Sequence, residues 1–84
     1  MVIPNVDYRD KRRRASVQAQ VGTEILVMRR QVKIRQEDLA VRAGITRPYL
    51  SEIENGKVDV SISVLYAIAT VLGRTISELL ENVG

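Results

Sequence analysis

The chain has 84 residues and a formal net charge of +3, as expected for one small, mildly basic domain. A chain of this length buries only about 60 to 65 % of its unfolded surface and cannot enclose a large substrate pocket. It contains no Cys and no His, which excludes zinc fingers, thiol redox chemistry and the Ser-His or Cys-His pairs of nucleophilic enzymes. The composition therefore predicts a protein that is not an enzyme.

The longest uninterrupted apolar run covers residues 64–69, far short of the roughly 18 residues that a membrane span requires. The first residues contain no hydrophobic region that resembles a secretion signal. We therefore expect a cytoplasmic protein with no membrane partner.

Residues 1–15 are expected to form a basic arm, flexible or only partly helical, ahead of a single domain at residues 16–84. Residues 1–14 hold five basic and two acidic side chains and so carry the whole excess charge, whereas residues 15–84 hold eight of each. The consecutive Arg12, Arg13 and Arg14 could follow a DNA backbone or enter a minor groove, or could simply solubilise the chain. The sequence leaves both interpretations open.

Helical periodicity dominates from residue 16 onward. Val21, Ile25, Met28 and Val32 form the apolar stripe of a first predicted helix. A second helix is predicted from about Gln36, with Leu39, Ala40 and Ala43 on its apolar side. It ends where Gly44 can take a left-handed conformation.

A third helix is predicted after the short turn at residues 44–46. The Thr46 hydroxyl can cap it, and Pro48 in its first turn loses no hydrogen bond. The helix ends at residues 55–56, with Leu50 and Ile53 facing inward. The residues expected to face outward are Arg47, Pro48, Ser51, Glu52 and Asn55.

A fourth helix is predicted with Ser61 as its cap and Gly73 as its end. A fifth begins with the capping-box spacing of Thr75 and Glu78 and runs to about Asn82. The buried stripe of the fourth helix is expected to be Ile62, Leu65, Ile68, Ala69 and Leu72. Five short helices joined by short turns, without the alternation of a strand, predict a compact all-α bundle.

The second and third predicted helices, joined by a tight glycine turn, form a helix-turn-helix unit, in which the second of the two helices enters the major groove of DNA. The sequence resembles the helix-turn-helix family of the lambda phage repressor and Cro, called the XRE family. The resemblance spans residues 21–80. The matching motifs are Val21-Gly22-x-x-Ile25-x-x-Met28-Arg29, Gln36-Glu37-Asp38-Leu39-Ala40-x-x-Ala43-Gly44-Ile45-Thr46-Arg47, Tyr49-Leu50-Ser51-x-Ile53-Glu54-Asn55-Gly56-Lys57, Ser63-x-Leu65-x-x-Ile68-Ala69-x-x-Leu72-Gly73 and Ser77-Glu78-Leu79-Leu80.

The resemblance implies a five-helix fold of the lambda-repressor type and a set of DNA contacts. Arg is the commonest reader of guanine and Glu can accept from cytosine, whereas Pro48 can offer only apolar contact, so base reading would rest on Arg47 and Glu52. For Glu52, simple solvation is an equal alternative. The positions implied to read bases are Arg47, Pro48, Ser51 and Glu52, and those implied to contact phosphates are Arg35, Gln36, Thr46, Tyr49, Asn55 and Lys57.

Three further sets of residues have roles that the residues themselves or the resemblance suggest. Arg29 and Glu54 match an ion pair between helices, which is a structural role. Glu37 and Asp38 are explained most simply by the positive end of their helix, with contact to RNA polymerase as an alternative. The third set consists of apolar residues beyond those that the helix stripes need. Ordinary burial in the core explains part of this set, and the rest is expected to form the contact patch of a homodimer. This set is Val58, Val60, Ile76, Leu80 and Val83.

The leading hypothesis is a sequence-specific transcriptional regulator that binds double-stranded DNA as a homodimer, without a cofactor or a small-molecule ligand. Its two recognition helices would lie about 34 Å apart and read a pseudo-palindrome. Small phage-type repressors and the controllers of restriction-modification systems are the members it most resembles. The alternative is an antitoxin that binds a toxin, with residues 1–15 as the segment available for that contact.

Overall fold

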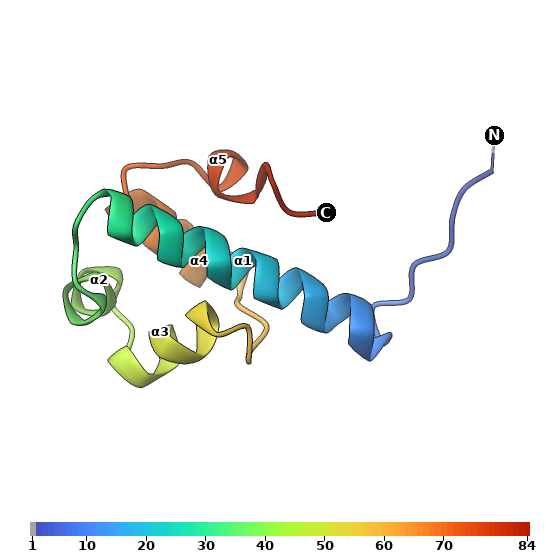
Figure 1. The fold of residues 1–84 in the computed structure, drawn as a ribbon, viewed down its shortest axis with the longest axis horizontal. Helices are drawn as coiled ribbons and strands as arrows, with labels where there is room; N and C mark the ends of the chain where they lie inside the picture. The colour runs from blue at the N-terminus through green and yellow to red at the C-terminus, as the bar shows by residue number, and fades with distance from the viewer. Residues whose placement is uncertain (1) are drawn as a thin grey trace.

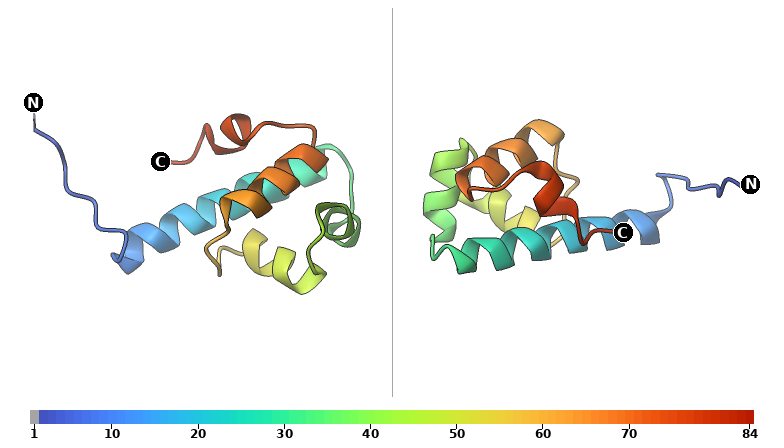
Figure 2. Two further views of the ribbon diagram at one scale, coloured as in Figure 1. Left: turned by 180° about the vertical axis from the view of Figure 1, so that it is seen from behind. Right: turned by 90° about the horizontal axis from the view of Figure 1, so that it is seen from above.

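The computed structural model describes residues 2–84, which fold into five α-helices and no strand. They are α1 (Lys11–Gln31), α2 (Gln36–Ala43), α3 (Arg47–Glu54), α4 (Ile62–Val71) and α5 (Ile76–Leu80). The long α1 crosses the molecule, with α2 and α3 below it and α5 above it (Figure 1). Seen from behind, α4 lies in front of α1 (Figure 2). The predicted all-α bundle is therefore confirmed.

The helices enclose one apolar core. α1 packs against α3 and α5, α2 packs against α3 and α4, and α4 also contacts α5. Every helix therefore packs against at least two others, and these contacts bury the apolar side chains. The buried hydrophobic residues are Val21, Ile25, Leu39, Ala40, Leu50, Ile53, Leu65, Ile68, Ala69, Leu72 and Leu79.

The helix caps confirm most of the predicted boundaries. The hydroxyl of Ser61 accepts from Val64 N at 3.2 Å, and Thr75 and Glu78 form the predicted capping box. These hydrogen bonds from Thr75 to the Glu78 carboxylate lower the pKa of Glu78, because they favour its charged form. α5 ends at Leu80, two residues before the predicted Asn82.

The segment predicted to be flexible or only partly helical contains the first residues of α1. The helix begins at Lys11 rather than near residue 16, because the Asp10 side chain caps it by accepting from Arg12 N at 3.0 Å and Arg13 N at 3.3 Å. Residues 11–14 place cations at the positive helix end, where they are unfavourable, and this charge run obscured the start. Only residues 2–10 of the predicted arm lie outside the helix.

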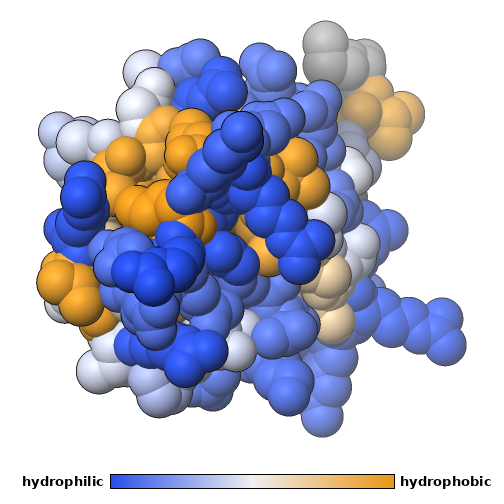
Figure 3. Space-filling view, turned by 60° about the vertical axis from the view of Figure 1, so that its left-hand side comes forward, coloured by the Kyte–Doolittle hydropathy of each residue, from blue (hydrophilic) through white to orange (hydrophobic). Residues whose placement is uncertain are grey.

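The prediction that Val32 and Ile62 belong to the buried apolar stripes was wrong. Val32 is 46 % exposed, because α1 ends at Gln31 and the chain turns through Lys33 with φ 58°. Ile62 is 69 % exposed, because it is the first residue of α4 and the buried stripe begins one turn later at Leu65. On one face of the molecule, hydrophobic side chains gather in patches among hydrophilic ones (Figure 3).

The chain end returns to α1, where Gly84 N donates to Gln20 Oε1 at 2.9 Å. Within residues 2–84, no helix is both long enough and apolar enough to cross a membrane.

Candidate nucleic-acid interface

The turn between α2 and α3 sets the position of the predicted recognition helix. Gly44 has φ 76°, the left-handed conformation that glycine adopts at low cost, and its N–H and that of Ile45 donate to the last carbonyls of α2. The Thr46 hydroxyl accepts from Tyr49 N at 3.2 Å and starts α3. The first residues of α3 are therefore held at the surface by local hydrogen bonds.

A buried ion pair joins α1 to the end of α3. Arg29 Nε lies 2.7 Å from Glu54 Oε2, and a second guanidinium nitrogen donates to Oε1 at 3.2 Å. The side chains are only 13 % and 4 % exposed. Arg29 also donates to the Ile34 carbonyl at 3.2 Å. The predicted helix-to-helix pair is thus present in bidentate form, which adds geometric specificity to the contact between α1 and α3.

The same carboxylate orients the predicted phosphate contact. Gln36 Nε2 donates to Glu54 Oε1 at 2.9 Å, and Gln36 Oε1 accepts from Arg47 Nε at 3.2 Å. A continuous polar chain therefore runs from Arg29 through Glu54 and Gln36 to Arg47. The Glu54 end of this chain is buried, and the Arg47 end is exposed. The buried ion pair therefore limits, through Gln36, the positions that the Arg47 guanidinium can take at the surface.

The residues predicted to read bases share one surface. A hollow of about 230 Å³ is lined by Gln36, Arg47, Pro48 and Ser51, and Glu52 is exposed next to Ser51 on α3. The Ser51 carbonyl accepts from Asn55 Nδ2 at 2.8 Å. The other predicted phosphate contacts lie at the two ends of α3. Thr46, Asn55 and Lys57 are exposed, and Tyr49 is half-buried.

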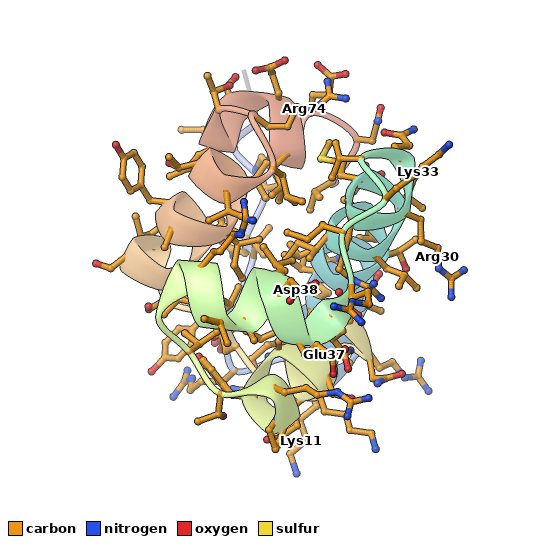
Figure 4. All side chains as sticks on the ribbon, turned by 90° about the vertical axis from the view of Figure 1, so that its left-hand side faces the viewer. Lys11, Arg30, Lys33, Glu37, Asp38 and Arg74 are labelled. Carbon is orange, nitrogen blue, oxygen red and sulfur yellow. The ribbon has the colours of Figure 1, made fainter. Side chains whose placement is uncertain are left out.

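Arg35 occupies a different environment from the other predicted phosphate contacts. Its Nε lies 3.0 Å from Asp38 and 3.6 Å from Glu37, and the hydrogen bond to Asp38, followed by the charges of Asp38 and Glu37, raises the pKa of Arg35. Glu37 and Asp38 lie on α2 (Figure 4). A phosphate would have to compete with these two carboxylates for Arg35.

Four of the five basic residues of the predicted arm form the exposed first turn of α1. Lys11, Arg12, Arg13 and Arg14 are all exposed, and Arg13 lies 3.8 Å from the capping Asp10. In Figure 4, Lys11 lies at the lower edge of the molecule, as α3 does, and Arg74 lies at the upper edge. The excess charge of the chain is therefore carried by a helix end on the side of α3.

The apolar residues predicted to form a dimer patch are half-buried against the core of their own chain. Packing on the core of their own chain thus explains part of why this chain has more apolar residues than its helix stripes need. Four of them, Val58, Val60, Leu80 and Val83, line a groove of about 290 Å³ beside α1. Ile76 also packs on the core but does not line this groove.

A sequence model of the helix-turn-helix family matches residues 25–79. The chain belongs to this family. As a helix-turn-helix protein of the XRE type, it is 37 % identical over 59 residues to the immunity repressor protein of Bacillus phage phi105, a match that covers 70 % of this chain and 41 % of the repressor. It is 34 % identical over 68 residues to the control protein C.MunI of a Mycoplasma species, which covers 80 % of this chain and 92 % of that protein.

The fold of this helix-turn-helix protein is also found in solved structures. The restriction-modification controller protein C.AhdI from Aeromonas hydrophila matches with a TM-score of 0.72 and 29 % identity over 74 % of this chain and 94 % of that chain. The chain spans less than half the length of the longer curated relatives it matches. The predicted resemblance to the family is therefore confirmed, and its relatives are transcriptional regulators rather than enzymes.

Sequence reasoning missed one contact of this helix-turn-helix protein that bears on function. Gln36 and Glu54 were assigned separate roles, and their hydrogen bond was not predicted, because they are 18 residues apart and no local spacing relates them. The resemblance had already placed Glu54 between helices and Gln36 at the start of α2. Because these two positions lie close together in the fold of the family, they could have indicated a contact between Gln36 and Glu54.

Proposed function

We propose that the chain is a transcriptional regulator that binds double-stranded DNA sequence-specifically as a homodimer on a pseudo-palindromic operator. The observation that carries this proposal is the polar chain ending at Arg47, since a guanidinium held in advance loses less freedom when it binds. In this proposal Arg47 reads a base edge and Gln36 contacts a phosphate. Pro48, Ser51 and Glu52 complete the reading surface, and Thr46, Tyr49, Asn55 and Lys57 flank it.

Arg47→Ala is expected to weaken binding to the operator by roughly 5- to 150-fold, the value of one bidentate contact to a base. Binding to unrelated DNA should change much less. The measurement is a gel-shift titration with the DNA upstream of the gene and with a scrambled duplex of equal length. Arg42→Ala, which removes the same charge from an exposed position on α2, is the matched control. A shift that is not sequence-selective, or that Arg47→Ala leaves unchanged, contradicts the proposal.

The first turn of α1 supplies a second contact in this proposal, made to the phosphate backbone by Arg12, Arg13 and Arg14. Because these residues lie on a helix, they would approach the DNA at a fixed distance from α3 rather than as a loose arm. They carry no base information in this role. Each phosphate they neutralise releases counterions and steepens the salt dependence of binding.

Replacing Arg12, Arg13 and Arg14 together by Gln is expected to reduce the slope of log K against log salt by up to about 2.7, since each lost contact contributes about 0.9. The preference for the operator over other DNA should stay the same. Stability should not fall, because the change removes cations from a positive helix end. The control triple is Arg30→Gln, Lys33→Gln and Arg74→Gln, which removes the same charge elsewhere (Figure 4). Equal slopes for both triples would count against the helix-end contact.

The homodimer is proposed to form on the side of Val58, Val60, Ile76, Leu80 and Val83. Four of these residues line an apolar groove at the surface. An exposed apolar surface on a small domain is a common site of contact with another protein chain. Contact of Glu37 and Asp38 with RNA polymerase stays a prediction. Both carboxylates lie within 4 Å of Arg35, which reduces the negative charge they offer.

A further inference from the structure

The chain carries an apolar segment that the DNA-binding role does not use. Residues 2–8 read Val-Ile-Pro-Asn-Val-Asp-Tyr and contain no basic residue and one acidic residue. Phosphates attract cations, so this segment is unsuited to the DNA contact proposed for the arm. Four of its side chains are nevertheless large, apolar or aromatic, and exposed, at 91 % for Val2, 82 % for Ile3, 64 % for Val6 and 79 % for Tyr8.

A hydrogen-bonded turn directs this segment away from its own domain. Asp10 N donates to the Asp7 carbonyl at 2.9 Å, and the Asp7 carboxylate accepts from Arg9 N at 2.9 Å and from its guanidinium at 3.0 and 2.8 Å. Residues 2–6 then run outward from the end of α1, away from the body of the molecule (Figures 1 and 2). In this arrangement residues 2–6 are all exposed, and their apolar side chains are open to a second molecule.

The same chain presents an apolar groove of suitable chemistry. The groove between α1, the loop after α3 and the chain end is lined by Val17, Val21, Val58, Val60, Leu80 and Val83 among others. A second hollow of about 210 Å³ shares Val17, Gln18 and Asp59 with it and reaches Val6 and Tyr8. The two hollows therefore form one strip from the base of the N-terminal segment to the chain end, which Gly84 and Gln20 hold against α1.

We propose that residues 2–6 of one copy lie in this apolar groove of a second copy, so that two chains exchange their N-terminal segments. The exchange rests on the homodimer of the proposed function, because the residues at the proposed dimer interface and those of the groove are largely the same. Association through that side brings the segment of one chain near the groove of its partner. Val2, Ile3 and Val6 then supply the apolar surface that the groove lacks, and five extended residues span roughly 16 Å.

Disulfide trapping tests the exchange, because the natural chain contains no Cys. A tagged Ile3→Cys chain is mixed with an untagged Val83→Cys chain, so that any mixed disulfide joins two copies. The matched control is Ile3→Cys with Ile62→Cys, whose position is 69 % exposed on α4 and outside both hollows. A mixed disulfide that forms with Val83→Cys at least tenfold faster than with Ile62→Cys is expected. Equal rates overturn the exchange.

Deleting residues 2–6 provides the second measurement. The dimer dissociation constant from sedimentation is expected to rise at least about tenfold, because burial of a single Val or Ile side chain is worth that much. A dimer unchanged by the deletion overturns the exchange and leaves the homodimer intact. A chain that stays monomeric, with and without operator DNA, overturns both proposals. Loss of a different bound protein on deletion, with an unchanged dimer, also overturns the exchange and favours the antitoxin alternative.

Discussion

Glu54→Ala is expected to lower the free energy of unfolding by about 3 to 5 kcal/mol. Removing the carboxylate leaves the Arg29 guanidinium, whose side chain is only 13 % exposed, without its counter-charge. Domains of this size are stable by roughly 4 to 13 kcal/mol, so this loss is a substantial fraction of the stability of the fold. Urea titration followed by circular dichroism measures the change.

Glu52→Ala is the matched control for this variant. It removes the same group from the same helix at an exposed position, where substitutions usually change stability by less than about 0.5 kcal/mol. Similar losses for Glu52→Ala and Glu54→Ala would contradict the importance of the buried pair. Because both residues are glutamates on α3, the two variants differ only in whether the side chain that they remove is buried or exposed.

A double variant separates the two roles of Glu54. Replacing Arg29 by Met and Glu54 by Leu together removes the pair without leaving a buried charge, and such changes are often neutral or stabilising. Stability is therefore expected to recover. Operator affinity should nevertheless be lower than that of the natural chain, because Gln36 loses its acceptor and no longer holds Arg47. Recovery of both properties would mean that the polar chain does not position Arg47.

The sequence predicted the helices well because their ends are set by local chemistry. Thr46, Ser61 and Thr75 cap the helices that directly follow them, and Gly44 reverses the chain next to the helix it ends. Such signals need no knowledge of the rest of the fold. The exact start of α1 within the partly helical segment was not predicted, because the cap, Asp10, is followed by four cations that oppose the helix dipole.

Burial and side-chain contacts were predicted less well because they depend on which helices meet. Periodicity assigned Val32 and Ile62 to the core, although the chain turns at one and begins a helix at the other. The surface shared by Gln36, Arg47, Pro48 and Ser51 requires α2 and α3 to be placed together. Their roles in reading DNA stay predictions, since they depend on a partner that the fold alone does not specify.

The close contact between α1 and α3 was also invisible in the sequence. Gly22 lies in the middle of α1, where a glycine ordinarily weakens a helix by about 1 kcal/mol relative to Ala. A Cβ atom at Gly22 would meet the carbonyl oxygen of Ile53 and would lie 2.7 Å from that of Glu54. The missing side chain therefore lets the end of α3 approach α1, which brings Glu54 to Arg29.

Gly22→Ala is accordingly expected to destabilise the protein by about 3 kcal/mol, the upper part of the range for overpacked sites. The added methyl group meets backbone atoms, which cannot move aside as a flexible side chain can. Displacement of α3 would also strain the Arg29 to Glu54 pair, so operator affinity should fall as well. Thr23→Ala, at the neighbouring exposed position, is the control and should change stability by no more than about 0.5 kcal/mol. If Gly22→Ala instead raised stability by the usual gain in helix propensity, the tight packing of α3 on α1 would be wrong.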